Sequence, residues 1–474
     1  MSLRHSSQLA TTQGDVSASQ PSDRFARGML AHVFTTAVRI VTQLAFLPLL
    51  FAFLTASQVG FWSMLLALPA YCIIAAQGLA TAGANAAIQK TNSNAEQAGA
   101  IYRAVCRKAV ATTLTTWLTI WILAEVLLFR SLIGPYSIDL GELRQIALLL
   151  GLSAMFAAAL CALEVPLRFS GRYPTFVVLA AAGTAAELAG LAIALLLGGE
   201  FVAMAAAIAA ARAMVWLFAR HAARAAAPLV FVTDEAPLPA IWRPALAFML
   251  LPLTYAINLQ AYVVLVGGAY GTATLAAFVA TRMLARLFDL FTGFVFSASF
   301  YEAAHTAAAK NGQLKQLAAS LTLLVLLAGL MFWVALLMLG PWLQQTWTLN
   351  KTAFDPSVAS MILAAAVCRA VSAFPSAVLA ARNAHGQFTA SYLGLSMAAF
   401  AACWVAMASG MPLWQTLLIP VIAEAIHTAL VLRQFLNTTG RSAEPFLRAV
   451  FSQAAVLELT RRASALRWRK RTHV

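Results

Sequence analysis

The chain has 474 residues, of which 61% are hydrophobic and only 10% are charged, and its mean hydropathy is +0.79. A soluble globular protein cannot bury so much apolar surface, so this composition excludes that class and predicts a protein that lies in a lipid bilayer. The net charge is +15, which in a soluble protein would suggest a nucleic-acid ligand. Here the basic residues lie beside apolar runs, and no nucleic acid is expected as a partner.

Apolar runs of about 20 residues, bounded by charged residues, proline or glycine, predict membrane-spanning helices. Six lie in the first half of the chain, at 28–53, 59–79, 109–129, 146–167, 176–197 and 201–219. Six more lie in the second half, at 244–266, 273–296, 317–339, 357–380, 390–408 and 414–435. Backbone groups in lipid must be hydrogen-bonded within the segment, so runs of this length favour helices over barrel strands. The predicted fold is an all-α polytopic membrane protein with twelve transmembrane helices.

The basic residues lie almost entirely at one end of these spans. When successive loops are assigned to alternate faces, 24 Lys and Arg residues fall on the face that carries both termini and 3 fall on the other. The positive-inside rule then predicts that both termini are cytoplasmic. The expected location is a bacterial-type inner membrane.

The two sets of six spans have a similar layout. Corresponding landmarks lie 213 to 220 residues apart, among them Arg27 and Arg243 before each first span and Arg220 and Arg433 at the end of each last span. This offset predicts a parallel repeat of two six-helix lobes with a cavity between them. The predicted parts are an N-terminal polar tail, a first lobe, a linker, a second lobe and a basic tail, at 1–27, 28–219, 220–243, 244–436 and 437–474.

The basic tail has apolar residues at helical spacing followed by a run of Arg and Lys. This pattern predicts an amphipathic helix that lies on anionic membrane lipid. A disordered basic tail is the alternative.

Ten ionisable side chains fall within the predicted spans, where a charge normally faces a cavity or a partner. They are Arg39, Arg212, Arg282, Arg286, Arg369, Glu125, Glu164, Glu187, Asp289 and Glu424. A guanidinium presents a planar fork of donors that matches phosphate, so an arginine-lined cavity suits a phosphate or pyrophosphate headgroup. The candidates for this role are Arg39 with Gln43 one turn later, Arg282 with Arg286, and Arg369.

The alternative is that these arginines form internal ion pairs and hold the helices together. Arg286 can pair with Asp289, and Arg212 can pair with Glu187. Three acids lie nearer to the ends of their spans and could instead extend to the membrane surface, namely Glu125, Glu164 and Asp289.

The seventh span carries polar residues at helical spacing. Tyr255, Asn258 and Tyr262 lie at i, i+3 and i+7, and hydroxyl, amide and aromatic groups are those that bind sugar rings. These three residues are therefore candidates for sugar binding. Hydrogen bonding between helices is the alternative.

The twelfth span carries Glu424 and His427 one helical turn apart. A buried carboxylate and an imidazole can exchange a proton, so this pair is a candidate for coupling transport to an ion gradient, of H⁺ or Na⁺. Glu187 is a further candidate for ion coupling.

The sequence lacks a nucleotide-binding glycine-rich loop and spaced metal ligands, so no cofactor or metal is expected. The outward loops at 130–145 and 340–356 are too short to form an external catalytic domain. A transporter is therefore expected rather than an enzyme such as a membrane glycan polymerase or ligase.

Two motifs resemble those of a known transporter family. Residues Thr55-Ala-Ser-Gln-Val-Gly60-Phe61-Trp62 are similar to its glycine-aromatic turn between the first two spans. Residues Gly267-Gly-Ala-Tyr-Gly271 and Phe278-Val-Ala-Thr-Arg282-Met-Leu are similar to its turn between spans seven and eight and to its arginine-bearing helix. With the twelve-span layout, the chain resembles the O-antigen-type and polysaccharide-biosynthesis flippases of the multidrug/oligosaccharidyl-lipid/polysaccharide exporter superfamily.

This resemblance implies transport of a polyprenyl-pyrophosphate-linked oligosaccharide, of the undecaprenyl type, by alternating access and ion-coupled antiport. The implied partners are this lipid-linked sugar, membrane lipids and other polysaccharide-assembly membrane proteins. A cation-coupled multidrug exporter of the same superfamily is the alternative, although it should carry an acid where Arg39 stands in the first span. A sugar or solute carrier of the other large twelve-span superfamily is a further alternative, although its charged motif between spans two and three is missing from 80–109.

Overall fold

A computed structural model describes residues 21–90, 95–125, 139–231, 242–289, 293, 311–381, 386–439 and 450. These residues form helices joined by turns, and no β-strand occurs among them. The predicted all-α class is thereby confirmed. The chain divides into two compact units, the first formed by residues 1–54 and 61–256 and the second by residues 55–60 and 257–474.

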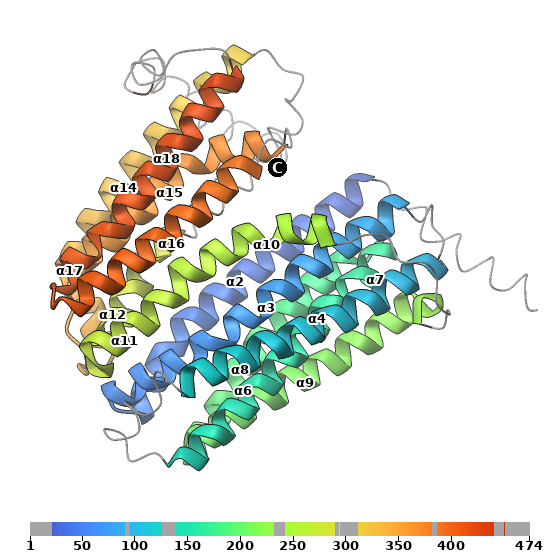
Figure 1. Cartoon of the computed structure of the whole chain (residues 1–474), viewed down its shortest axis with the longest axis horizontal. Coiled ribbons are helices and arrows are strands. Elements are labelled where there is room, and N and C mark those ends of the chain that lie inside the picture. Colours follow the sequence, from blue (N-terminus) through green and yellow to red (C-terminus); the bar gives the residue numbers. More distant parts are fainter. Residues whose placement is uncertain are drawn as a thin grey trace, which may run out of the picture. The chain divides into compact units, whose positions relative to one another are not determined.

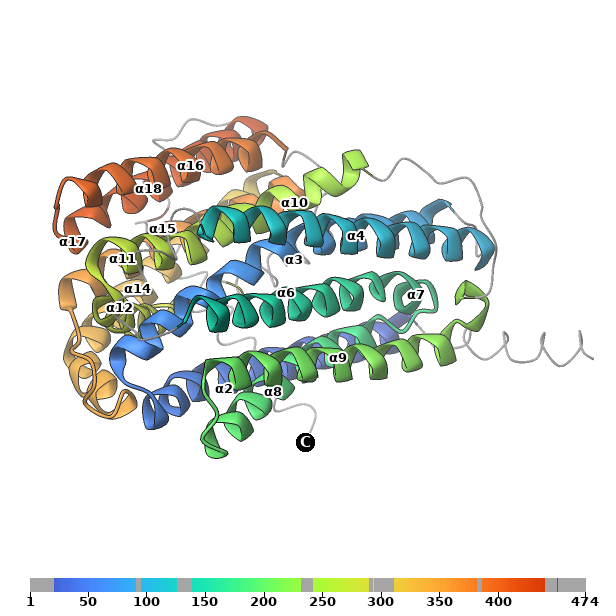
Figure 2. The same ribbon diagram turned by 60° about the horizontal axis from the view of Figure 1, so that its bottom comes forward.

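The first unit is a bundle of long helices (Figures 1 and 2). Its elements are α2 (Pro21–Phe53), α3 (Ala56–Lys90), α4 (Ala95–Ala124), α6 (Leu140–Ala162), α7 (Glu164–Phe169), α8 (Tyr173–Leu196), α9 (Phe201–Ala226), the short 3₁₀ helix η2 (Pro228–Phe231) and α10 (Trp242–Ala256). Helix α9 packs on both α6 and α8, and α2 packs on α8. Alanines dominate the core that α3 shares with α4, including Ala76, Ala80, Ala98 and Ala109. Small side chains let membrane helices approach closely.

The second unit contains the remaining helices. Its elements are the π-helix η3 (Ile257–Ala261), α11 (Tyr262–Tyr270), α12 (Thr272–Ala285), α14 (Asn311–Trp347), α15 (Pro356–Ala381), α16 (Gly386–Ala408), α17 (Leu413–Thr416) and α18 (Leu418–Thr439). Helix α15 packs on α14, α18 and α12, and α16 packs on α18. Helix α15 is therefore the central element of this unit.

Where the structure describes them, the twelve predicted spans overlap a helix or consecutive helices, and residues 126–129, 290–292 and 294–296 of two spans lie outside the described residues. Among the described residues, nine helical segments are long and apolar enough to cross a membrane. Several helices extend beyond the predicted spans, because an apolar run marks the lipid-exposed length while backbone hydrogen bonding continues into the polar flanks. The basic tail at 437–474 lies outside the described residues except at 437–439 and 450, so its predicted helix stays a prediction.

The seventh span is not the single α-helix that its hydropathy predicts. It begins as α10, which contains Pro252, continues through the π-turn η3 and ends as α11. The chain passes from the first unit to the second at this turn, between Ala256 and Ile257. The predicted lobe boundaries at 219 and 244 stay predictions.

Gly60 lies near the start of α3, in the short part of this helix that belongs to the second unit, against the backbone of Thr272 at the start of α12. A Cβ atom at position 60 would overlap the Thr272 carbonyl oxygen. Backbone cannot move aside as a flexible side chain can, so this close approach requires glycine.

We expect Gly60→Ala to lower the free energy of unfolding by about 1–3 kcal/mol, the usual cost of overpacking. Gly268→Ala in α11 is the matched control, because a Cβ there meets no atom within 4 Å. Denaturant titration in detergent, followed by tryptophan fluorescence, measures both. Equal stabilities of the two variants would contradict the close approach.

Candidate functional site

A pocket in the second unit collects most of the predicted site residues. Its empty volume is about 520 Å³, including the open space at its mouth. The polar side chains that line it are Asn258, Tyr262, Arg282, Arg286, Arg369 and Glu424. Its apolar wall comes from residues of α15 and from the region of α17 and α18, namely Met361, Ile362, Ala365, Leu417 and Pro420. We call this cavity the arginine pocket.

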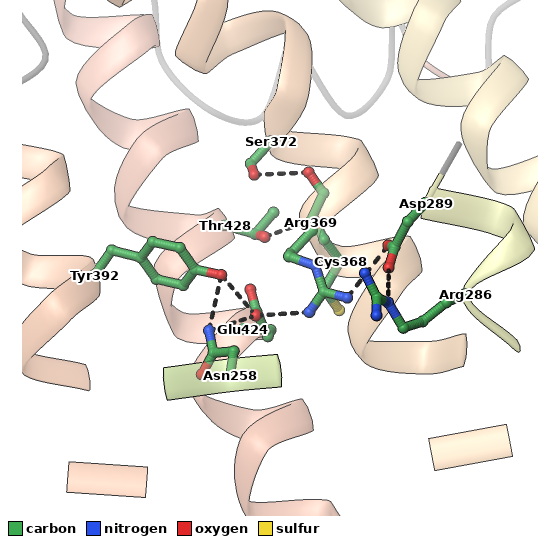
Figure 3. Close-up of polar contacts among 9 residues, drawn as sticks. All are labelled: Asn258, Arg286, Asp289, Cys368, Arg369, Ser372, Tyr392, Glu424 and Thr428. Carbon is green, nitrogen blue, oxygen red and sulfur yellow. Dashed lines mark hydrogen bonds and ion pairs between the residues drawn. The ribbon is translucent and has the colours of Figure 1, made fainter. Parts of the chain in front are cut away.

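Arg369 of α15 lies at the centre of a charge network beside the pocket (Figure 3). Its Nη1 donates to Oε1 of Glu424 at 2.8 Å, and its Nη2 donates to Oδ1 of Asp289 at 3.3 Å. The second carboxylate oxygen of Asp289 lies 3.4 Å from Nε of Arg286. Arg369 therefore holds two acids from different helices, and its role as a free phosphate ligand is weakened.

Of the two possibilities for Asp289, pairing with an arginine or extension toward the membrane surface, the structure shows the pairing. Its side chain is only 25% exposed and contacts Arg286 and Arg369 at once. A carboxylate that two guanidiniums neutralise can stay inside, whereas an unpaired one must reach water. The alternative in which Arg286 pairs with Asp289 is thus the arrangement that the structure has.

A tyrosine and an amide extend the network at Glu424. The hydroxyl of Tyr392 in α16 donates to Oε1 of Glu424 at 2.8 Å, and Nδ2 of Asn258 donates to that hydroxyl at 3.1 Å (Figure 3). Nδ2 also lies 3.4 Å from Oε1 of Glu424. Thus Asn258 ties the π-turn to α16 and α18. Its amide makes the hydrogen bonds between helices that are the alternative to sugar binding, and it also lines the pocket.

Arg282 of α12 binds the backbone of the π-turn. Its Nη1 donates to the carbonyl oxygen of Leu259, and its guanidinium lies 5.5 Å from the ring centre of Phe278. A π-turn departs from the regular hydrogen-bond pattern of an α-helix. The arginine therefore serves a backbone oxygen and lines the pocket at the same time.

The formal charges of this group do not cancel. Three arginines line the pocket, at 282, 286 and 369, and the acids in the network are Glu424 and Asp289. This leaves one positive charge in excess within the group. Such a balance suits an anionic ligand, because in a site of low dielectric an excess charge attracts a counter-charge strongly.

His427 does not pair with Glu424 in this structure. Its ring stacks on Tyr392 with centres 3.9 Å apart, and among the described residues its buried Nδ1 has no hydrogen-bond partner. Oε2 of Glu424 likewise has none among the described residues. The two residues share the network through Tyr392, so their role in ion coupling stays a prediction.

The first unit holds the other predicted site residues. Arg39 and Gln43 lie on α2, where Arg39 is exposed and its side chain makes no hydrogen bond or ion pair to the rest of the described chain. Glu187 and Arg212 form a two-point ion pair, with distances of 2.7 and 3.2 Å. This is the pair predicted by the alternative in which the arginines form internal ion pairs. In this structure Glu187 therefore joins α8 to α9, and its role in ion coupling stays a prediction.

Tyr255 and Tyr262 have different environments although their spacing predicts one helix face. Tyr255 is 43% exposed and belongs to α10, whereas Tyr262 is 4% exposed and lines the arginine pocket. The π-turn between them adds a residue to one turn, so the 3.6-residue phase on which their grouping rests is lost.

Sequence reasoning missed Tyr392. It is the single tyrosine of the predicted span 390–408, and nothing local marks it as the partner of a carboxylate on another helix. One hydrogen bond joins α18 to α15 near the network, from the Thr428 hydroxyl to the Cys368 carbonyl at 2.7 Å. Within α15, the Ser372 hydroxyl donates to the Arg369 carbonyl at 2.9 Å. These bonds help to hold Arg369 in place (Figure 3).

Comparisons with protein-family models and with curated proteins find no match. Solved structures do match. The lipid II flippase MurJ in an inward closed conformation has a TM-score of 0.61 at 10% identity, over 91% of this chain and 92% of MurJ. An outward-facing multidrug resistance MATE family transporter of the MOP superfamily has a TM-score of 0.59 at 13% identity, over 90% of this chain and 97% of the transporter.

A MATE protein in the straight conformation is similar too, with a TM-score of 0.56 at 12% identity, over 90% and 97% of the two chains. At such low sequence identity, these structural matches show the fold and not the function. The O-antigen-type subfamily stays a prediction, and this chain is a multi-pass membrane protein with the fold that MATE transporters and the MurJ flippase share.

Proposed function

We propose that this protein flips a polyprenyl-pyrophosphate-linked oligosaccharide from the cytoplasmic to the outer leaflet of a bacterial inner membrane, for the synthesis of cell-surface polysaccharide. The observation that carries the proposal is the arginine pocket, in which Arg282, Arg286 and Arg369 outnumber Glu424 and Asp289. Guanidinium groups match phosphate oxygens with two parallel hydrogen bonds. A pyrophosphate headgroup supplies the charge that this pocket lacks.

The polar residues around the pocket support a sugar-bearing ligand. Asn258 and Tyr262 bring an amide and a phenol ring to its wall, and such groups bind hydroxyl-rich rings through hydrogen bonds and ring contacts. In the first unit, Arg39 and Gln43 are candidates for binding the phosphate headgroup. Transport follows by alternating access in this proposal, driven by antiport of H⁺ or Na⁺ through Glu424, His427 and Glu187.

A multidrug exporter is the second candidate. Its support is Oε2 of Glu424, which lies in a buried side chain at the pocket and has no hydrogen-bond partner among the described residues. A carboxylate oxygen in that position suits an organic cation or a proton. The two candidates thus differ in the sign of the charge that the pocket accepts.

The test compares cells that lack the gene with cells that regain it as the wild type, as Arg39→Ala, as Arg282→Ala in the pocket or as Arg107→Ala. Arg107 is an exposed arginine of α4 outside the pocket and serves as the matched control. We expect the deletion to accumulate lipid-linked oligosaccharide and to lose surface polysaccharide, and only the wild type and Arg107→Ala to restore both. Unchanged glycan pools with increased sensitivity to cationic drugs would instead support the exporter.

A further inference from the structure

Gln344 is a fully buried amide near the C-terminal end of α14, and its side chain bonds in two directions. Its Oε1 accepts a hydrogen bond from the hydroxyl of Thr281 in α12 at 2.9 Å. Its Nε2 donates to the hydroxyl of Thr352 at 3.2 Å and to the carbonyl of Ala353 at 2.8 Å. Gln344 and Thr281 are 0% and 1% exposed, respectively. One side chain thus joins α12 to the segment that leads into α15.

The segment that Gln344 holds is tightly bound at both ends. Thr348 donates to the backbone carbonyl of Gln344 at 2.8 Å, and Thr352 donates to the Thr348 hydroxyl at 3.1 Å. A little further on, Asp355 accepts hydrogen bonds from the backbone N–H groups of residues 357 and 358 at 2.9 and 3.0 Å. An aspartate that caps the first turn fixes where a helix begins. The capped start of α15 thus follows directly after the residues that Gln344 binds, Thr352 and Ala353.

Gln344 contacts α12 and the segment that leads into α15, and both of these helices carry residues of the arginine pocket. Thr281 directly precedes Arg282, and Arg286 follows one turn later, so a bond that fixes the rotation of α12 at residue 281 also fixes the direction of these two guanidiniums. Arg369 lies about 20 Å along α15 from its start, at 1.5 Å per residue. Gln344 is therefore expected to affect Arg282 and Arg286 more than Arg369.

We propose that Gln344 and Thr281 are positioning residues, which set the rotation of α12 and so present Arg282 and Arg286 to the ligand of the arginine pocket. The role of these arginines in ligand binding rests on the proposed function, whereas the rotation of α12 does not. A buried amide with every group hydrogen-bonded specifies one arrangement of helices, because any rotation of α12 leaves a polar group without a partner in an apolar surrounding.

The test uses Thr281→Val, which keeps the shape of the side chain and removes only the hydroxyl, with Thr281→Ser as the variant that keeps the hydroxyl. Thr113→Val is the matched control. The hydroxyl of Thr113 is also fully buried and bonds across helices, to the carbonyl of Cys72 at 3.1 Å, but in the first unit. The two valine variants therefore lose bonds of the same kind at different places.

Two measurements on the purified full chain decide the proposal. Amide hydrogen exchange reports opening of α12, and titration with inorganic pyrophosphate reports its dissociation constant. We expect Thr281→Val to speed exchange in α12 and at 348–358 and to raise the dissociation constant, each about tenfold, as loss of a buried hydrogen bond allows. Thr281→Ser should stay within about twofold of the wild type, and Thr113→Val should change neither quantity.

The outcomes separate the two proposals. If the wild type does not bind pyrophosphate, the proposed headgroup contact fails, while the exchange of α12 still decides the positioning role. That role is overturned if Thr281→Val leaves exchange in α12 unchanged, or if Thr113→Val accelerates it equally. It is also overturned if Thr281→Val speeds exchange while the wild-type pyrophosphate affinity persists.

Discussion

Arg369→Met should lower the free energy of unfolding by about 3–5 kcal/mol, because it leaves the carboxylates of Glu424 and Asp289 without their shared partner in a poorly hydrated site. The unpaired charge of Glu424 accounts for most of this loss of stability, since its side chain is only 4% exposed. Asp289 keeps Arg286 as a partner. Methionine replaces the unbranched stem of the arginine side chain and removes its guanidinium, so most of the apolar packing is kept.

The double variant Arg369→Met with Glu424→Gln supplies the control. Glutamine keeps an oxygen to accept the hydroxyl hydrogen of Tyr392 and removes the stranded charge, so it should recover more than half of the lost stability. Denaturant titration of both variants in detergent measures the recovery. A single variant within about 1 kcal/mol of the wild type, the range of a surface ion pair, would show that the network contributes little.

Arg282→Ala should weaken pyrophosphate binding by about 10- to 150-fold, the range that corresponds to the loss of a hydrogen bond to a charged group. Arg282→Lys should fall between the alanine variant and the wild type, because an ammonium keeps the charge but not the planar fork. Titration of the purified protein with pyrophosphate measures all three. The same series should order the rates of lipid-linked oligosaccharide transport.

Arg282 also lies beside the ring of Phe278, so loss of that contact needs a control. Phe278→Leu leaves the arginine in place and changes only the ring beside its guanidinium. It should keep binding within about fivefold of the wild type, since cation–π contacts contribute about 0.5–1 kcal/mol at accessible sites. Wild-type affinity in Arg282→Ala would remove this arginine from the binding site.

The sequence predicts the apolar helices. It also predicts the ion pairs whose partners share one helix turn or lie at similar depth in consecutive spans. Apolar length marks each span, and the i, i+3 spacing of Arg286 and Asp289 makes their contact a property of a single helix turn. The sequence also predicts the pair of Arg212 with Glu187, because both charges lie near the middle of consecutive spans. These contacts follow from local geometry or from the cost of an unpaired charge in lipid.

The rest of the site depends on how distant segments pack. Arg369 and Glu424 lie 55 residues apart in the chain, and no spacing rule selects this acid over the others. The π-turn is equally hidden, because Ile257-Asn-Leu-Gln-Ala261 has the composition of an ordinary helix. Tertiary contacts such as the bond from Arg282 to the Leu259 carbonyl stabilise that turn, and they are absent from any local window of sequence.

The π-turn lets the seventh span hold one residue more than a regular α-helix while the residues after the turn keep their phase. Deleting one residue from 257–261 would restore a regular α-helix and leave α11 in nearly the same phase. The hydropathy of the span would hardly change, so membrane insertion would tolerate the deletion. A single missing codon would therefore leave an inserted, helical protein in which no π-turn presents Asn258 to Tyr392.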